Sequence, residues 1–333
     1  MADPPPGRRA VPRGWKRELL PGSPHDIAER TLCRVKPVTR LFLFGAPVAI
    51  VVSILFSSGD SEPPALSPLP SGSPNTAQAV PEGAARADEH AEELKALPPG
   101  LAAPRTKEIA SRLVASAEAS TLNWRGLYGA IDDVGDGNGY TAGIIGFSSG
   151  TNDMLQLVEA YTEDHPDNPL APFLPALRAV DGSDSHEGLD PGFTAAWREA
   201  AGDPAFRTAQ DATRDRLYFD PAVRLAKLDG LGTLGQFLYY DAMVLHGPGV
   251  EANGFYGIRD AAMAQADTAA EGGDEETYLG AFLDAGRAAI TARKVQRDTT
   301  RIDTAQRVFL SAGNLELEPP LVWRVYGEEF RIS

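Results

Sequence analysis

Two carboxylates, Glu118 and Asp136, stand eighteen residues apart across a break in the sequence pattern. Glu118 falls in the last turn of a predicted helix, and Asp136 falls in a turn with glycine at positions 135, 137 and 139. Hydrolysis of a glycosidic bond needs one protonated carboxyl and one ionised carboxyl. A helix end over apolar neighbours disfavours the charged form and suits the acid, whereas a polar turn suits the ionised partner. Because helix glutamates are usually solvated and Asp-Gly is common in turns, these two residues alone leave a purely structural interpretation open.

Other interpretations of the acidic turn are weaker. A calcium loop that starts at Asp136 would place Phe147 at its twelfth position, where a bidentate glutamate is needed. A loop that starts at Asp132 would place Val134 at the third, ligating position. The three aspartates of this stretch would repel a phosphate group. The five histidines show no H-E-x-x-H spacing, so we expect no metal site. We also expect no cofactor.

The sequence GFSSG at 146–150 matches the nucleophile elbow of esterases, with Ser148 as the nucleophile. Asp241 and His246 follow in the order that a catalytic triad of this type requires. Both lie in one predicted helix, however, which is too local for a triad. The chain also lacks strands for the broad parallel sheet that the elbow needs. We therefore favour a strand end followed by a helix cap at this position.

The predicted elements are mainly helices. A helix with the sequence KEIASRLVASAEAS, capped by Thr106, carries Glu118, and TAGIIGF after the acidic turn predicts a short strand. Segments such as HPDNP, FDP and HGPG break the helical pattern of the remaining chain. The predicted helices there are 152–162, 170–180, 193–201, 204–218, 221–229, 231–245, 256–266, 275–296 and 304–312. We expect a mainly α (α+β) fold with one small sheet near the acidic turn.

The N-terminal part of the chain differs in composition from the rest. Residues 1–40 hold nine Lys/Arg against four acidic residues and predict a disordered basic leader. Residues 41–59 are apolar and predict a signal or membrane-anchor segment that leaves the leader inside. Residues 60–104 predict a Pro/Ser/Ala-rich linker, and 105–333 predict one folded domain. We expect an extracellular protein, with secretion and tethering to the outer face of the membrane both open.

The excess negative charge belongs to the predicted folded domain. The net charge is −15, and residues 1–92 hold ten basic and ten acidic residues, so the remaining 21 basic and 36 acidic residues carry all of it. Such a domain attracts cations and repels nucleic acid, so we expect no nucleic-acid partner. Cys33 is the one cysteine of the chain. A folded part without cysteine suits an exported domain large enough to be stable without disulfides.

The sequence from about residue 105 to 333 resembles the chitosanases of glycoside hydrolase family 46. The strings that carry the resemblance are GDGNGYTAGIIGF, SGTNDMLQLV, RDRLYFDPAV, LGQFLYYDAMVLHGPG and RIDTAQRVFLSAGNLELEPPL. The resemblance implies endo-acting, inverting hydrolysis of β-1,4 bonds in chitosan. It also implies a lysozyme-like fold with two lobes that flank a cleft, and chitosan or glucosamine oligosaccharides as partners. We expect a monomer. Two alternatives stay open: an inactive cell-surface polysaccharide-binding protein and a lysozyme-like muramidase.

Individual residues acquire roles through this resemblance. Glu118 matches the general acid of the family, and Asp136 matches the general base. Thr141 matches a threonine that helps to position the attacking water, and Asp153 matches a substrate-binding aspartate. An inverting enzyme keeps its two carboxyl groups roughly 6.5–9.5 Å apart, which leaves room for that water.

A buried charge network completes the expected site, and one departure from the family pattern falls within it. Asp241 and Arg301 match residues that link to the catalytic acid through this network. Gly286 stands where a further arginine of the network is expected, and Arg287 is one position away. The remaining departures concern outer sugar-binding positions: Asn138, where a basic residue is expected, and Arg293 and Arg297, where acids are expected.

Overall fold

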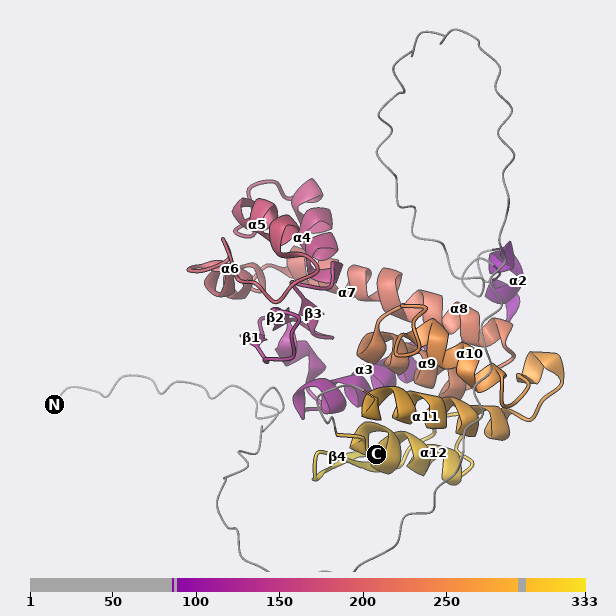
Figure 1. Cartoon of the computed structure of the whole chain (residues 1–333). Helices are drawn as coiled ribbons and strands as arrows, with labels where there is room; N and C mark the ends of the chain where they lie inside the picture. Colours follow the sequence, from indigo (N-terminus) through magenta and orange to yellow (C-terminus); the bar gives the residue numbers. More distant parts are fainter. Residues whose placement is uncertain (1–85, 87–88, 293–297) are drawn as a thin grey trace, which may run out of the picture. The chain divides into compact units, whose positions relative to one another are not determined.

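The structure is a computed structural model that describes residues 86, 89–292 and 298–333 (Figure 1). The predicted leader at 1–40, the predicted apolar segment at 41–59, most of the predicted linker, and both Arg293 and Arg297 lie outside the described residues. Within the described part of the chain, no helix is both long enough and apolar enough to cross a membrane.

The described chain packs against the domain from α2 (Ala91–Ala96) onward, before the predicted boundary at residue 105. Leu94 in α2 and Leu101 in the 3₁₀ helix η2 (Gly100–Ala102) are both buried. The backbone N–H of Leu101 donates to Gln236 Oε1 at 2.9 Å. The end of the predicted linker is therefore folded, because its apolar side chains and a backbone group find partners in the domain.

The helix that carries Glu118 is α3 (Pro104–Ala119), and it begins before the predicted cap Thr106. Proline is favoured in the first turn of a helix because its missing N–H would have no helical partner there. Thr106 instead donates its hydroxyl to the carbonyl of Gly100 at 2.6 Å. The helix ends at Ser120, whose φ of 47° is left-handed. Because most of the second half of α3 is buried, Glu118 leaves the helix inside the domain.

A three-stranded antiparallel sheet follows α3. β1 (Ile131–Asp133) pairs with β2 (Tyr140–Ala142), and β2 pairs with β3 (Phe147–Ser148), so the acidic turn connects β1 to β2. The prediction of one continuous strand for TAGIIGF is wrong. A turn interrupts it, in which Gly143 and Gly146 have φ values of 77° and 79°. These left-handed conformations reverse the chain between β2 and β3.

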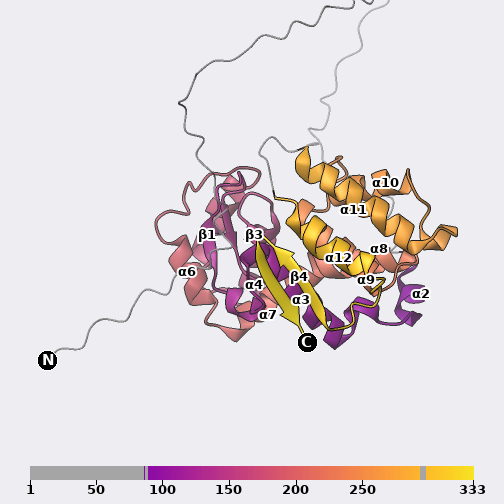
Figure 2. The ribbon, with the colours of Figure 1, turned by 90° about the horizontal axis from the view of Figure 1, so that it is seen from below.

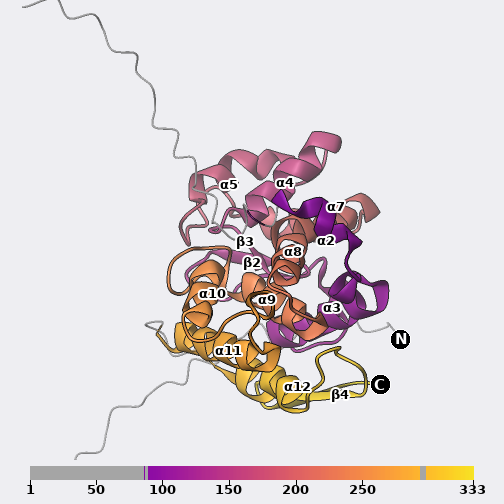
Figure 3. The ribbon, with the colours of Figure 1, turned by 90° about the vertical axis from the view of Figure 1, so that its right-hand side faces the viewer.

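The remaining helices confirm the predicted mainly α pattern and form two groups. Around the three-stranded sheet lie α4 (Asp153–Asp164), α5 (Leu174–Val180), α6 (Phe193–Ala200) and α7 (Pro204–Arg214), with the 3₁₀ turns η3 (Trp124–Leu127) and η4 (Ala171–Phe173). The second group comprises α8 (Asp220–Leu228), α9 (Thr233–His246), α10 (Phe255–Met263), η6 (Ala269–Glu271), α11 (Glu275–Thr291) and α12 (Arg307–Ser311). In this group α9 contacts α3, α8 and α10 (Figure 3), and most of its residues are buried.

One helical run over residues 204–228 joins the two groups (Figure 1). The segment FDP predicts a break here, but the chain passes from α7 through the π-helix η5 (Asp215–Phe219) directly into α8. Pro221 has no N–H to donate, and in a regular α-helix its ring would clash with the carbonyl four residues earlier. The wider turns of the π-helix η5 lie just before Pro221 and give space for its ring. The helix therefore continues across the proline.

A second sheet is missing from the sequence-based prediction. It is the hairpin of β4 (Leu321–Val325) and β5 (Glu328–Ile332), which lies beside α3 in Figure 2. Alternate residues of β4 are buried, and both residues of the connecting turn have positive φ, as type I′ hairpin turns require. Trp323 Nε1 donates to Ser116 Oγ at 3.0 Å, which attaches the hairpin to the helix that carries the predicted acid.

Candidate active site

A pocket of about 450 Å³ is lined on one side by the three-stranded sheet and on another by the end of α9. Glu118 and Asp136 both line it, so the predicted acid and base face the same space. The sheet also contributes Thr141, and the other group of helices contributes residues 244–248. The site therefore lies where the two groups of helices meet, which agrees with the predicted cleft between two lobes.

Glu118 is largely enclosed, with 24% of its side chain exposed. Its Oε1 accepts a hydrogen bond from Arg301 Nη1, although the two residues are 183 positions apart in the sequence. Gly146 lies beside the other oxygen of Glu118, Oε2. The backbone at position 146 has a φ of 79°, a conformation that favours glycine. A Cβ atom at Gly146 would stand 3.9 Å from Oε2, so this oxygen lies beside a residue that lines the pocket, while Oε1 binds the guanidinium.

Arg301 joins Glu118 to a second carboxylate. Its Nε and Nη2 donate to the two oxygens of Asp241, each at 2.7 Å. The side chains of Arg301 and Asp241 are 5% and 2% exposed. Burial opposes the positive charge, but Asp241 and Glu118 outweigh it and raise the pKa of Arg301 well above its usual range. The structure thus brings together the three residues that the resemblance places in one charge network.

Gln306 is a member of this network that the sequence analysis missed. Its Nε2 donates to Asp241 Oδ2, the oxygen that also accepts from Arg301 Nε. The two donors, Arg301 and Gln306, belong to η7 (Arg301–Gln306), a π-helix in which positions i and i+5 share a face. The predicted α-helix over 304–312 excludes Arg301 and gives no such pairing. The one feature of the sequence that could have pointed to Gln306 is its spacing of five residues from Arg301.

Arg287 does not replace the arginine expected at position 286. Its Nε donates to both carboxylate oxygens of Asp303, at 3.0 and 3.1 Å, and 46% of its side chain is exposed. Gly286 is buried, and a Cβ atom there would meet Ile302 at 3.5 Å. The network around Asp241 therefore contains one guanidinium and one amide among its described partners.

Asp136 is held by its own turn. Its Oδ1 accepts from the backbone N–H of Asn138 at 3.2 Å, and its Oδ2 accepts from Asn138 Nδ2 at 3.1 Å. All three glycines of the turn have φ between 69° and 88°, which other residues rarely adopt. The departure at Asn138 thus replaces the expected basic side chain with a neutral donor that orients the carboxylate.

Ser148 is not built as a nucleophile. Its hydroxyl donates to the carbonyl of Gly146 and lies 3.3 Å from Thr141 Oγ1. Asp241 is bound to Arg301 and Gln306, as described above, and is thereby unavailable to orient a catalytic histidine. The esterase alternative has no support in this geometry.

Asp153 is a buried support of the site. Its Oδ1 accepts from the backbone N–H of Ser148 and from Thr151 Oγ1, at 3.0 and 2.8 Å, as well as from its own helix start. Its Oδ2 accepts from Tyr218 Oη at 2.7 Å. Asp153 lines the pocket and is only 5% exposed, so it links the sheet, α4 and η5 around the space that the predicted substrate would occupy.

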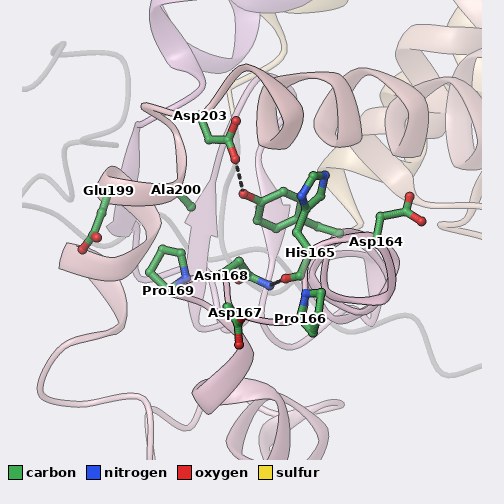
Figure 4. A pocket seen from close by; sticks show the side chains of 10 residues that line it. Asp164, His165, Pro166, Asp167, Asn168, Pro169, Glu199, Ala200 and Asp203 are labelled. Atoms are coloured by element: carbon green, nitrogen blue, oxygen red, sulfur yellow. Dashed lines mark hydrogen bonds between the residues drawn. The ribbon is translucent and has the colours of Figure 1, made fainter.

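A second hollow, of about 500 Å³, lies at the end of α4 and contains none of the predicted site residues (Figure 4). Tyr161 donates to Asp203 at 2.7 Å, and all the polar atoms of Asn168 have protein partners. Asp164 and Glu199 lie on opposite sides of the hollow rather than converging on one point. Across the described residues, no group of three or more His, Cys, Asp or Glu side chains is arranged to hold a metal ion.

A mainly helical protein with two carboxylates facing one pocket, one of them tied to a buried guanidinium, has the features of a glycoside hydrolase. The chain belongs to glycosyl hydrolase family 46, whose sequence model matches residues 112–321. Among curated proteins, the chitosanase of Streptomyces sp. (strain N174) is 58% identical over 234 residues, which cover 70% of this chain and 84% of that protein. The chitosanase of Nocardioides sp. (strain N106) is 53% identical over the same length.

Solved structures of the family have the same fold. A structure described as a chitosanase complex is 52% identical, with a TM-score of 0.69 over 70% of this chain and 99% of that one. The family 46 chitosanase of Gynuella sunshinyii in complex with chitotetraose is 32% identical, with a TM-score of 0.65 over 69% of this chain and 98% of that one. These similarities confirm the predicted family and the mainly α, lysozyme-like fold.

The contact between Tyr218 and Asp153 makes a testable prediction about pH. Burial raises the pKa of Asp153, and the hydrogen bond from Tyr218 opposes that rise, so Tyr218→Phe should raise this pKa further. In the wild type the hydrogen bond from Tyr218 stabilises the ionised carboxylate of Asp153. Its removal should therefore lower the free energy of unfolding by about 1.5–3 kcal/mol at neutral pH. The loss should shrink as the pH falls and Asp153 becomes protonated. Urea unfolding of both proteins from neutral pH to about pH 4 measures this difference, and a constant difference would contradict the assignment.

Proposed function

We propose that this chain is an endo-acting chitosanase that hydrolyses β-1,4 bonds of polyglucosamine with inversion. The observation that carries the proposal is that Glu118 and Asp136 line one pocket from different elements. Its substrate class is supported by the curated relatives, which are named chitosanases, and by the solved relative in complex with chitotetraose.

Glu118 is assigned the role of general acid. Because Oε1 accepts from Arg301, the proton to be delivered belongs on Oε2, the oxygen beside Gly146. In this mechanism Oε2 gives its proton to the glycosidic oxygen as the bond from that oxygen to C1 breaks. The carboxylate left behind stays paired with the guanidinium of Arg301, which compensates the new negative charge.

Asp136 is assigned the role of general base. The two hydrogen bonds from Asn138 orient its carboxylate while leaving lone pairs on both oxygens. In this mechanism Asp136 takes a proton from water as the water oxygen bonds to C1 on the face opposite the leaving group. Thr141, which lines the same pocket, is assigned to orient that water.

The charge of the domain favours a cationic substrate. Polyglucosamine carries ammonium groups near and below neutral pH, and a body with a net charge of −15 concentrates such a chain at its surface. A muramidase substrate gains nothing comparable from this field. We therefore place chitosan ahead of the cell-wall polysaccharide as the substrate.

Replacing either assigned carboxylate should abolish turnover without unfolding the protein. We expect Glu118→Gln and Asp136→Asn each to lower kcat on soluble chitosan by about 10²–10⁴-fold, because each removes one proton-transfer partner. Reducing-end release measures the rate, and circular dichroism checks the fold. Near-normal activity of either variant would remove that residue from its role.

The matched controls are Glu163→Gln and Asp167→Asn, which change exposed carboxylates outside the pocket. Both controls should retain wild-type activity. Binding of chitosan without release of reducing ends by the wild-type protein would favour the alternative of an inactive polysaccharide-binding protein. Clearing of a cell-wall suspension without chitosan cleavage would favour the muramidase.

The inverting mechanism predicts the configuration of the first product. Hydrolysis of a β-linked glucosamine hexamer should release reducing ends in the α configuration before mutarotation mixes the anomers. Proton NMR in the first minutes of the reaction distinguishes the two anomers. Initial formation of the β anomer would contradict Asp136 as a base and would require a covalent intermediate.

We also propose that the protein is exported through its apolar segment at 41–59, since the basic flank precedes that segment. Secretion would leave a shortened protein in the medium, whereas tethering would leave the full chain in the membrane fraction. Fractionation of the producing cells, followed by mass determination of the recovered protein, separates the two outcomes. Recovery of the full chain from the cytosol alone would contradict export.

A further inference from the structure

The turn that carries Asp136 is held from outside the pocket by a histidine in the loop between α5 and α6. We propose that His186 is a positioning residue for this turn, an inference that rests on the proposed role of Asp136 as base. His186 does not line the pocket, so it reaches the reaction only through the turn. Its contacts fall on Asp133 and Tyr140, the last pair of residues in the β1–β2 ladder before the turn.

The first contact holds the residue that enters the turn. His186 Nε2 lies 3.5 Å from Asp133 Oδ2, within ion-pair range. The other oxygen of Asp133 accepts from the backbone N–H of Gly135 at 2.7 Å and so shapes the first residues of the turn. Nε2 is buried and has no hydrogen-bond partner among the described residues, and the Asp133 carboxylate is the charged group that it faces. Removal of the imidazole therefore takes away one contact of the carboxylate that organises the start of the turn.

The second contact holds the residue that leaves the turn. The imidazole of His186 stacks on the ring of Tyr140, with centroids 4.0 Å apart and planes inclined by 9°. Tyr140 Oη donates to Asp190 Oδ1 at 2.7 Å, and Asp190 Oδ2 lies 3.7 Å from His186 Nδ1. Burial and the Asp190 carboxylate raise the pKa of Tyr140 to about 12, so its hydroxyl keeps the proton that it donates. These three side chains form a closed ring of contacts.

Backbone contacts join the same loop to the middle of the turn. The N–H of Gly182 donates to the carbonyl of Gly150 at 3.2 Å, and the N–H of Gly150 donates to the carbonyl of Asn138 at 3.0 Å. A Cβ atom at Gly150 would stand 2.1 Å from the carbonyl oxygen of Ser183, so the two backbones are in close contact. Asn138 is the residue whose two donors orient Asp136. The loop thus supports the turn at its entrance, its middle and its exit, and His186 is the side chain common to the two ends.

The proposal is tested with a graded pair of variants. His186→Phe keeps a flat ring against Tyr140 but removes both nitrogens, and His186→Ala removes the ring as well. Asp133→Asn leaves the histidine in place and removes the charge that it faces. The control is His165→Phe, which changes an exposed histidine at the end of α4 that contacts neither β1 nor β2 in the described structure. Thermal unfolding of every variant shows whether the folded fraction is intact.

The first readout is amide hydrogen exchange of residues 134–140, measured without substrate. We expect His186→Phe to speed exchange in this segment by about tenfold while leaving α10 and α11 unchanged, because the opening is local. Exchange of residues 134–140 should be faster in His186→Ala than in His186→Phe. In His165→Phe it should occur at the wild-type rate. Unchanged exchange of the turn in folded His186→Phe and His186→Ala would overturn the proposal.

The second readout is steady-state hydrolysis of a glucosamine hexamer. A displaced base slows the chemical step, so kcat should fall by about tenfold to a hundredfold in His186→Phe, while KM stays within about twofold. The double variant with Asp133→Asn should be no slower than the slower single variant, because the two residues act through one contact. A rise in KM alone, or fully additive losses, would overturn the proposal. A wild-type protein that leaves the hexamer intact would refute the proposed function, and hydrogen exchange would still decide the role of His186.

Discussion

The structure depends on one buried guanidinium shared by two carboxylates. Arg301 is bound through three of its nitrogens, and the paired Asp241 is almost completely buried. Removing charges from water costs several kcal/mol per ion, and a buried pair is tolerated only where hydrogen bonds satisfy it well. Here α3, α9 and η7 each contribute one of the charges, so the packing of these elements must bring three distant positions together. The contact from Arg301 fixes one oxygen of Glu118 at the buried end of α3.

Both π-helical segments of the described chain serve the pocket. The first, η5, supplies Tyr218, whose hydroxyl holds Asp153, and the second, η7, supplies Arg301 and Gln306. A π turn is less favourable than an α turn and is seldom kept unless it presents side chains in a way that α geometry cannot. In η7 the five-residue spacing directs two donors at one carboxylate. The irregular helical geometry is thus concentrated where the side chains of the site need it.

Most helices could be predicted from the sequence for local reasons, whereas Glu118 and Asp136 received their predicted roles through the resemblance to family 46. Apolar periodicity and glycine-rich or proline-rich breakers are properties of short segments, and they located the helices to within a few residues. The helix through Pro221 was mispredicted because a π turn changes what a proline does. The β4–β5 hairpin was missed although its alternation and turn are visible in the sequence. Gln306 and His186 were missed because their partners, Asp241 and Asp133, are far away in the sequence. Such contacts arise only from tertiary packing.

The separation of 183 positions between Glu118 and Arg301 has a consequence for the newly made chain. Translation produces Glu118, Asp136 and the whole three-stranded sheet well before it produces Arg301. The hairpin that donates from the Tyr326 backbone to Thr300 Oγ1, and so fastens the segment around Arg301, emerges later still. A nascent polypeptide therefore carries both carboxylates as separate solvated groups. Glu118 meets Arg301 only after almost the entire domain has been synthesised, so the pocket is completed by contacts between distant segments rather than by local folding.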